Sequence, residues 1–359
     1  MNSCFETAMD LSNTTRNQHY LPQVEQRLNA ANPDASIKRQ RIYSFEVTDR
    51  ERLSLRLENP NGRPISSTLA FQDLFSFDVA SNDTSRLNFE ALFERYERRI
   101  YEISQRLYQN IRADFSTLRE TVIIVSESPF YGDIVDLFTF KILNFARNPH
   151  SITKALNTFG GLATYYPTSP KHLSYFERII EGQRPHQRWL CQELGVSEQD
   201  YITWLKAIFM LFVEVDAEGT DFLTSMVRGL FQDEKSIVGV MVATYDDPIC
   251  LVSDRAVTTN ISQHGVEGFD FNVCSRAFVR YIFGKVDAMV PHAPQHLLEG
   301  FKRPSKQIHF HHRHNDLVVL GSFNRNVVFQ SHRRVYSAIK SPVIPPEPEK
   351  VPGFEQFSP

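Results

Sequence analysis

Cysteine is scarce in this chain: the four that it has, Cys4, Cys191, Cys250 and Cys274, stand far apart in the sequence. No two of them form a CxxC pair, so we expect neither a disulfide framework nor a cysteine-rich zinc site. Four scattered thiols are typical of a protein kept in a reducing compartment. The cysteines therefore predict a cytoplasmic location.

Long apolar runs are missing as well. Met1–Asp10 lacks the basic and apolar segments of a secretory signal. The most apolar stretch, Ala207–Val215, is far shorter than the roughly 20 residues that span a bilayer. We therefore expect no membrane partner.

Neither sign of charge is in excess. Against 42 Asp and Glu residues stand 39 Lys and Arg residues, which leaves a formal net charge of −3. Such a balance does not predict a protein coated in nucleic acid, although net charge does not exclude a basic groove on one part of the surface. The phosphate-binding loop, HExxH, GxSxG and zinc-finger signatures are also absent, which argues against a P-loop NTPase, a zincin protease and an α/β-hydrolase.

Phenylalanine, in contrast, is abundant: there are 28 among 359 residues, and they predict an aromatic-rich interior. The distribution of apolar residues predicts an α+β fold, with an N-terminal strand region, a predominantly helical middle at about 86–235 and a C-terminal sheet-containing part at about 236–340. We expect residues 17–340 to form one large domain. A flexible lead-in at 1–16 would precede it, and a Pro-rich disordered tail at 341–359 would follow.

Hydrophobic periodicity marks the main elements. Arg41–Val47 alternates polar and apolar residues, as a half-buried strand does. Phe89–Ile111 repeats apolar residues every three or four positions, which predicts an amphipathic helix with a solvated charged face; the alternative is a face that contacts phosphate. Phe130–Arg147 is apolar nearly all round and predicts a buried helix. Ser197–Val215 predicts a helix with a capped start.

The last third of the sequence changes character. Ile237–Tyr245 and Ile249–Ser253 predict two antiparallel strands, joined tightly at 246–248. Val286–Val290 and Gln307–His311 predict further strands. These runs are the basis for expecting a sheet in this part.

The stretch Asn17–Gln23 (Asn-Gln-His-Tyr-Leu-Pro-Gln) is the first candidate for chemistry. His19 is suited to general acid or base catalysis, because the unperturbed pKa of histidine is about 6.5. Gln23 would orient a ligand or a second side chain, and Pro22 would stiffen the segment. The alternative is a structural histidine that closes a turn.

Asp254 is the second candidate, because it directly follows the strand-like run that ends at Ser253. The end of a buried strand is a common place for a catalytic or metal-binding carboxylate. The alternative, an aspartate that caps the following loop, is favoured by the local sequence.

Four histidines close together, His309, His311, His312 and His314, are the third candidate. On a strand, His309 and His311 share one face and the other two share the opposite face. Imidazole pairs at this spacing can chelate a transition metal. Without a cysteine or carboxylate at a fixed spacing, an exposed histidine-rich edge is favoured.

The stretch Asn17–Gln23 resembles the N-x-H-Y-x-P-Q signature of a large, mostly bacterial family known as domain of unknown function 4238. Shorter resemblances over most of residues 17–337 are a helix with paired glutamates, a Ser-Asp step and a C-terminal asparagine, here Glu90, Glu97, Ser253-Asp254 and Asn324. The sequence departs from this pattern at Arg255, where asparagine is common. Genes of the family resemble components of bacterial antiviral defence loci, so the resemblance implies a defence effector.

The first functional hypothesis is an effector enzyme, a nuclease that acts on RNA or DNA. Its catalytic residues would be His19, Gln23 and Asp254. In a metal-independent form, His19 is the general acid or base and an arginine stabilises phosphate charge. In a metal-dependent form, Asp254 holds Mg²⁺ through its oxygens. The residues expected to bind the substrate are Asn17, Tyr20, Arg41, Arg255 and Asn324.

The second hypothesis is a non-enzymatic sensor or interaction component of a defence or toxin–antitoxin system. In it, the Asn17–Gln23 stretch is a structural lock between the N- and C-terminal regions, and the aromatic-rich helices are a binding surface. The partner would be a protein of the same defence locus, or a second copy of the chain in a homo-oligomer. The nuclease hypothesis requires nucleic acid as the partner instead.

Overall fold

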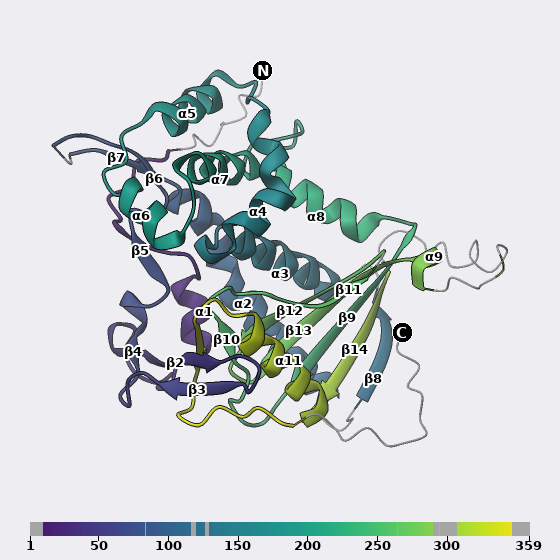
Figure 1. Ribbon diagram of the computed structural model, residues 1–359. Coiled ribbons are helices and arrows are strands. Elements are labelled where there is room, and N and C mark those ends of the chain that lie inside the picture. The colour runs from purple at the N-terminus through teal and green to yellow at the C-terminus, as the bar shows by residue number, and fades with distance from the viewer. Residues whose placement is uncertain are drawn as a thin grey trace.

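A six-stranded sheet, a five-stranded sheet, two two-stranded sheets and a group of helices make up the described part of the fold (Figure 1). The computed structural model describes residues 10–82, 84–115, 120–125, 129–263, 265–289, 294 and 307–346. Within these residues, no helix combines the length and the apolar character needed to cross a membrane.

The larger sheet has six strands in the order β11-β12-β13-β9-β14-β8. Its strands are β8 (Glu120–Val125), β9 (Ser236–Thr244), β11 (Thr258–Gln263), β12 (Val266–Cys274), β13 (Ala277–Lys285) and β14 (Ile308–His314). The pairing of β14 with β9 is parallel and the other pairings are antiparallel. β-Branched and aromatic residues dominate these strands and suit a pleated surface that packs on both faces.

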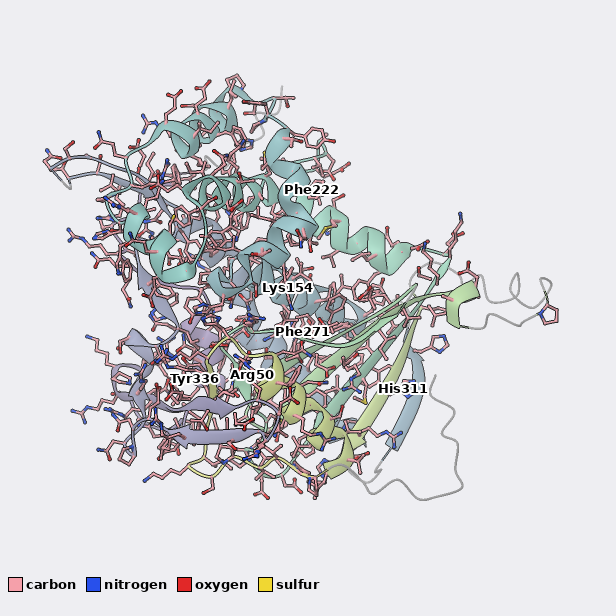
Figure 2. All side chains as sticks on the ribbon, in the orientation of Figure 1. Arg50, Lys154, Phe222, Phe271, His311 and Tyr336 are labelled. Atoms are coloured by element: carbon pink, nitrogen blue, oxygen red, sulfur yellow. The ribbon has the colours of Figure 1, made fainter. Side chains whose placement is uncertain are left out.

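Helices cover both faces of the larger sheet. On one face, Phe138 of α3 (Pro129–Ala146) packs on Tyr281 of β13, with ring centroids 4.8 Å apart. Phe271, labelled in Figure 2, belongs to the same face and lies 5.9 Å from Phe138. On the other face, Phe323 of α11 (Leu317–Gln330) stacks on a β13 residue, Phe278, at 4.1 Å. The predicted aromatic interior is thus divided between the two faces.

The smaller sheet joins N-terminal and C-terminal segments. β2 (Arg41–Asp49) lies between β3 (Ser54–Leu57) and β15 (Arg334–Ser337), and β15 pairs in turn with β10 (Val252–Ser253). A two-residue strand, β4 (Arg63–Pro64), also pairs with β2. Two further pairs are β1 (Asn17–His19) with β5 (Ala70–Gln72), and β6 (Ser76–Val79) with β7 (Arg86–Asn88).

The longest helix, α2 (Glu90–Phe115), packs beside α3 in the middle of the molecule. The other helices are α1 (Gln23–Leu28), α4 (Ile152–Phe159), α5 (Pro170–Glu181), α6 (Gln187–Leu194), α7 (Glu198–Leu211), α8 (Phe222–Gln232) and α9 (Val286–Met289). The apolar positions predicted for α2 are buried from Phe89 to Ile111, except Tyr96, which is partly buried. Ser197 caps α7 as expected, because its Oγ accepts a hydrogen bond from the Asp200 N–H at 3.0 Å.

The predicted α+β class is confirmed, but two details of the C-terminal part are wrong. Ile237–Tyr245 and Ile249–Ser253 do not pair with each other, because β9 lies in the larger sheet and β10 in the smaller one. The Asp-Asp-Pro turn at 246–248 therefore connects two sheets. Val286–Val290, predicted as a strand, begins with helix α9, and residue 290 lies outside the described residues.

The two flanking segments are held more firmly than expected where the structure describes them. In the predicted flexible lead-in 1–16, Leu11 is buried and Ser12 forms a β-bridge with Leu87. In the predicted disordered tail 341–359, the Val343 carbonyl accepts a hydrogen bond from Asn324 at 2.7 Å. Residues 1–9 and 347–359 lie outside the described residues.

Candidate functional site

The stretch Asn17–Gln23 passes from a strand into a helix. Asn17 to His19 form β1, and Pro22, with φ of −51°, precedes the first turn of α1. This change of direction brings the Gln23 amide within 2.9 Å of the His19 imidazole. Asn17 donates to the Ser66 carbonyl at 2.9 Å, which fixes the start of the stretch.

A chain of hydrogen bonds fixes the tautomer of His19. Arg27 can only donate, so its Nη2 donates to Oε1 of Gln23 at 2.6 Å. The Gln23 Nε2 then donates to Nε2 of His19, and the Nδ1–H of His19 donates to the Thr68 carbonyl at 2.9 Å. Both ring nitrogens are therefore engaged, as they are in a histidine that organises its neighbours.

Burial lowers the pKa of His19 from 6.5 to about 4, because the charged imidazolium is poorly solvated there. The Thr68 carbonyl opposes this change, whereas the positive charges of Arg147 and Arg27 reinforce it. His19 is consequently neutral at neutral pH. Because the charges of Arg147 and Arg27 both affect this pKa, the two arginines lie close to the imidazole.

Arg147 lies directly after the last residue of α3. The helix end is anchored there, since the Trp204 indole donates to the Ala146 carbonyl at 2.7 Å. The Arg147 side chain is only 1% exposed, pairs with Glu97 at 2.8 Å and lies over the Phe93 ring at 4.5 Å. The side chain of Glu97 is 32% exposed, so the pair reaches solvent on that side.

Glu90 stands in the first turn of α2, on the same side of the helix as Glu97 because the two are seven residues apart. Burial raises the pKa of Glu90 from 4.5 to about 7, and the nearby Arg147 charge offsets only part of that effect. Glu97 and Glu94 add to the rise through repulsion between like charges. Glu90 is therefore close to half-protonated at neutral pH, the condition that suits a general acid or base.

Several buried polar atoms in this region have no hydrogen-bond partner in the part of the chain that the structure describes. They are Oε1 of Gln26, Nε of Arg27, Oε1 of Glu90, and both Nε and Nη2 of Arg147. Buried polar groups are nearly always hydrogen-bonded, so such a concentration marks a place for water or a ligand. The residues of this region are named the Arg147 cluster: His19, Gln23, Gln26, Arg27, Glu90, Glu97 and Arg147.

The Asp254 carboxylate accepts hydrogen bonds from three successive backbone N–H groups, those of His332, Arg333 and Arg334, at 2.7 to 2.8 Å. Within the described residues, no hydrogen bond or ion pair joins Asp254 to His19 or Gln23, although its charge acts on the Tyr20 hydroxyl. The carboxylate thus holds the distant 332–334 loop, whereas the alternative drawn from the sequence was a cap for the loop that directly follows Asp254.

Burial raises the pKa of Asp254, although the three backbone hydrogen bonds oppose that rise. The backbone of the same residue is held too, since the Asn148 side chain donates to its carbonyl at 2.9 Å. Asn148 directly follows Arg147 in the sequence. The loop that carries Asp254 is therefore tied to the end of α3.

A second group of polar side chains extends outward from Tyr20. Its hydroxyl lies 3.3 Å from Nε2 of His150, and the His150 ring stacks on that of His332 with centroids 4.3 Å apart. Burial lowers the pKa of His150 to about 3, with contributions from His332 and Arg255. The side chains of Arg255 and Lys154 make no hydrogen bond with any described residue, although the Asp254 charge partly offsets the lowering of the Arg255 pKa by burial; Figure 2 labels Lys154 on α4.

The remaining predicted substrate-binding residues have structural partners. Arg41 donates through Nε and Nη2 to the Gly62 carbonyl at 3.3 and 3.0 Å. Asn324 is fully buried, accepts from the Leu251 N–H and donates to the Ile249 carbonyl. Both side chains therefore tie loops together.

The predicted histidine-rich edge is wrong, because β14 lies inside the sheet between β9 and β8. His312 is 1% exposed, and its Nε2 lies 2.9 Å from Oγ1 of Thr244. His314 approaches the same oxygen at 3.0 Å. No group of three or more His, Cys, Asp or Glu side chains within the described residues is placed to hold a metal ion.

The sequence pointed to only part of the Arg147 cluster. Glu90 and Glu97 were visible as paired glutamates, seven residues apart on an amphipathic helix. Arg147 was missed, because a basic residue at the end of a helix is common and favourable beside the helix dipole. The available signal was an arginine just before Asn148-Pro149, at the end of an otherwise apolar helix.

Comparisons with known proteins add no relative. No protein-family model matches the chain, and neither a curated protein nor a solved structure does. The resemblance based on Asn17–Gln23 therefore stays a prediction, and the geometry of the Arg147 cluster carries the functional argument.

Proposed function

We propose that the chain is a nuclease, which cleaves a phosphodiester of RNA or DNA at the Arg147 cluster. The observation that carries this proposal is a set of five buried polar atoms that find no hydrogen-bond partner within the described ranges. Two of them are on Arg147, and one is on Glu90, whose pKa is about 7. Residues with strongly shifted pKa values are frequent at catalytic sites. The nucleic-acid substrate is the one expected from the family resemblance.

Two residues of the cluster take the central roles. The free donors of Arg147 bind a phosphate oxygen through charge-assisted hydrogen bonds and stabilise the charge that develops on it. Glu90, as a carboxylate, accepts the proton of the attacking water. The water oxygen bonds to phosphorus, the bond to the leaving oxygen breaks, and that oxygen takes a proton from solvent.

His19 acts as a positioning residue in this proposal. Both of its nitrogens are occupied, by Gln23 and by the Thr68 carbonyl. Its contribution is to hold Gln23, which in turn orients Arg27. This role differs from the general acid or base expected from the sequence.

The metal-independent form of the reaction is favoured over Mg²⁺ bound by Asp254. Three backbone N–H groups already use both carboxylate oxygens of that residue. The Arg255 and Lys154 side chains, which are close enough to act on each other electrostatically, would supply contacts to further phosphates of the same strand. A cytoplasmic location and a role in antiviral defence are parts of this proposal.

The test uses the purified full chain with tRNA, total RNA and plasmid DNA, each with Mg²⁺ or with a chelator. We expect cleavage of at least one substrate, and a loss of about 100-fold or more in Glu90→Gln, the usual size for a general acid or base. Glu102→Gln is the matched control, because Glu102 lies on the same helix, is exposed and is not among the charges that shift the pKa of Glu90. The proposal fails if the wild-type protein cleaves none of the substrates, or if Glu90→Gln retains full activity.

A second candidate is a sensor that binds a partner without chemistry. It is favoured by the buried contacts of α1 with α3, where Lys141 and Asn144 both donate to Glu25. These contacts tie the N-terminal segment to the helical middle, and Asn29 of the same segment exchanges hydrogen bonds with Asn272 of the C-terminal part at 2.9 and 3.1 Å, as a lock between the N- and C-terminal regions requires. The partner would be a protein of the same locus or a second copy of the chain. Self-association of the purified chain in size-exclusion chromatography, without cleavage of any of the three nucleic acids, would favour this candidate.

A further inference from the structure

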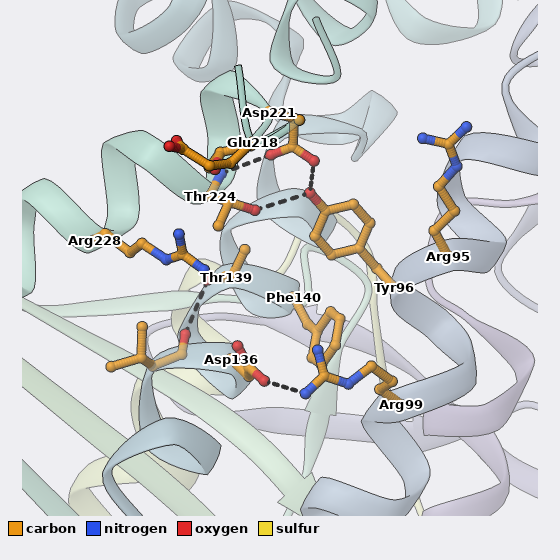
Figure 3. A pocket seen from close by; sticks show the side chains of 13 residues that line it. Arg95, Tyr96, Arg99, Asp136, Thr139, Phe140, Glu218, Asp221, Thr224 and Arg228 are labelled. Atoms are coloured by element: carbon orange, nitrogen blue, oxygen red, sulfur yellow. Dashed lines mark hydrogen bonds and ion pairs between the residues drawn. The ribbon is translucent and has the colours of Figure 1, made fainter. Parts of the chain in front are cut away.

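A separate cavity of about 390 Å³ lies between α2, α3 and the start of α8, away from the Arg147 cluster (Figure 3). Arg95 and Tyr96 of α2, Asp136 and Phe140 of α3, and Arg228 of α8 are among the residues that line it. Its volume falls within the range of about 300–1,000 Å³ that small-molecule sites occupy. Neither functional hypothesis drawn from the sequence uses this cavity.

Three carboxylates line the cavity, those of Asp136, Glu218 and Asp221, and those of Asp136 and Asp221 are already engaged. Asp221 accepts a hydrogen bond from the Thr224 N–H at 2.8 Å and another from the Tyr96 hydroxyl, and Figure 3 shows both contacts. Asp136 pairs with Arg99 at 2.6 Å. These interactions fix one wall of the cavity and neutralise one of its arginines.

Two other arginines line the cavity. The side chains of Arg95 and Arg228 make no hydrogen bond and no ion pair with any residue in the described ranges, although the charge of Arg228 lowers the pKa of Asp136. In Figure 3 they lie on either side of the Tyr96, Asp221 and Thr224 group. They come from different helices, so the fold itself brings both guanidinium groups to one cavity.

We propose that this cavity binds a small phosphate-bearing molecule, with Arg95 and Arg228 as its anion contacts. Guanidinium groups match the geometry of phosphate and form charge-assisted hydrogen bonds with it. The Thr224 hydroxyl supplies a neutral polar contact at the same wall, whereas the Tyr96 phenol already donates its proton to Asp221. The shared chemistry of the ligand is a phosphate group, either free or esterified to a nucleoside.

The site is placed to influence the Arg147 cluster without overlapping it. Tyr96 and Glu97 are neighbours on α2, and Tyr96 faces the cavity while Glu97 pairs with Arg147. A ligand that orders this turn of α2 therefore acts on the helix that also carries Glu90. Binding at the cavity does not depend on the nuclease proposal, and the two can be tested apart.

The experiment is isothermal titration calorimetry on the full chain with inorganic phosphate, pyrophosphate and AMP as probes. We expect saturable binding of at least one probe, weakened about tenfold or more in the double variant Arg95→Gln/Arg228→Gln. Arg98→Gln is the matched control: Arg98 is exposed on the same helix, pairs with Glu94 and does not line the cavity. Equal binding of phosphate and AMP identifies the free phosphate group as the recognised part, whereas preference for AMP identifies the ester.

Two results would overturn the proposal. One is the absence of binding of all three probes to the wild-type chain. The other is unchanged affinity in the double variant, which would place the bound phosphate elsewhere, for instance at Arg147. The two substituted side chains are exposed, so a matching thermal melting curve confirms that the variant is folded.

Discussion

Replacing Glu90 by glutamine should stabilise the protein at alkaline pH and leave its stability nearly unchanged at acid pH. In the folded chain burial raises the pKa of Glu90 from its ordinary value of 4.5 to about 7. Folding therefore takes up a proton between these two pH values, and the free energy of unfolding falls as the pH rises through that interval. Above pH 7 the destabilisation is complete, and below pH 4.5 it is absent.

The magnitude of the destabilisation follows from the size of the change in the pKa of Glu90. Each factor of ten in the ionisation constant corresponds to about 1.4 kcal/mol, so the upper limit is about 3 kcal/mol. Glu90 is partly exposed and lies near Arg147, so we expect about 1–3 kcal/mol in favour of the glutamine variant at pH 8.5. Glutamine keeps the shape of the side chain and removes the charge.

The assay is urea unfolding of wild-type, Glu90→Gln and Glu102→Gln proteins at pH 5 and pH 8.5. Replacing the exposed Glu102 side chain should produce no such difference between the two pH values. A Glu90→Gln protein that is less stable than wild type at pH 8.5 would refute the reasoning. A variant that gains stability while it loses activity is the usual signature of a destabilised catalytic site.

Other predictions concern the residues that hold the site in place. Lys141→Met should destabilise the fold by about 3–5 kcal/mol in urea unfolding, because it leaves the Glu25 carboxylate buried without its cation. Adding Glu25→Gln to this variant should restore part of the lost stability. Asp254→Ala should lower the melting temperature, because three backbone N–H groups lose their acceptor; a variant with unchanged melting and no activity would instead support a catalytic Asp254. His19→Ala should lower the melting temperature by several degrees in a fluorescence-monitored scan, because it breaks a partly buried chain of hydrogen bonds. An unchanged melting curve would contradict the positioning role of His19.

Local patterns in the sequence predicted the elements that depend on neighbouring residues. The apolar repeat of Phe89–Ile111 became α2, and the alternation of Arg41–Val47 became β2. The pairing of strands was harder to foresee, because β-partners can be far apart in the chain. Val335 lies opposite Phe45, and nothing near either residue in the sequence specifies the other.

For the candidate site, too, the sequence predicted contacts between residues that are near in the chain but not between distant ones. His19 and Gln23 were predicted to act together, and they lie 2.9 Å apart because one short turn joins them. Asp254 was assigned to the same site although more than 200 residues separate it from them, and its carboxylate instead binds the loop at 332–334. Arg147 contacts Glu97 across two packed helices, a contact that requires the fold to be known.

The pairing of β2 with β15 has a consequence for how the chain is synthesised. Glu46 and Arg333, which contact each other across these strands, are 287 positions apart. At about 5–20 residues per second, a ribosome needs roughly 15–60 s to make the intervening chain. During that time the edge of β2 that will receive β15 has no partner, so a nascent chain should depend on chaperones to protect it from aggregation.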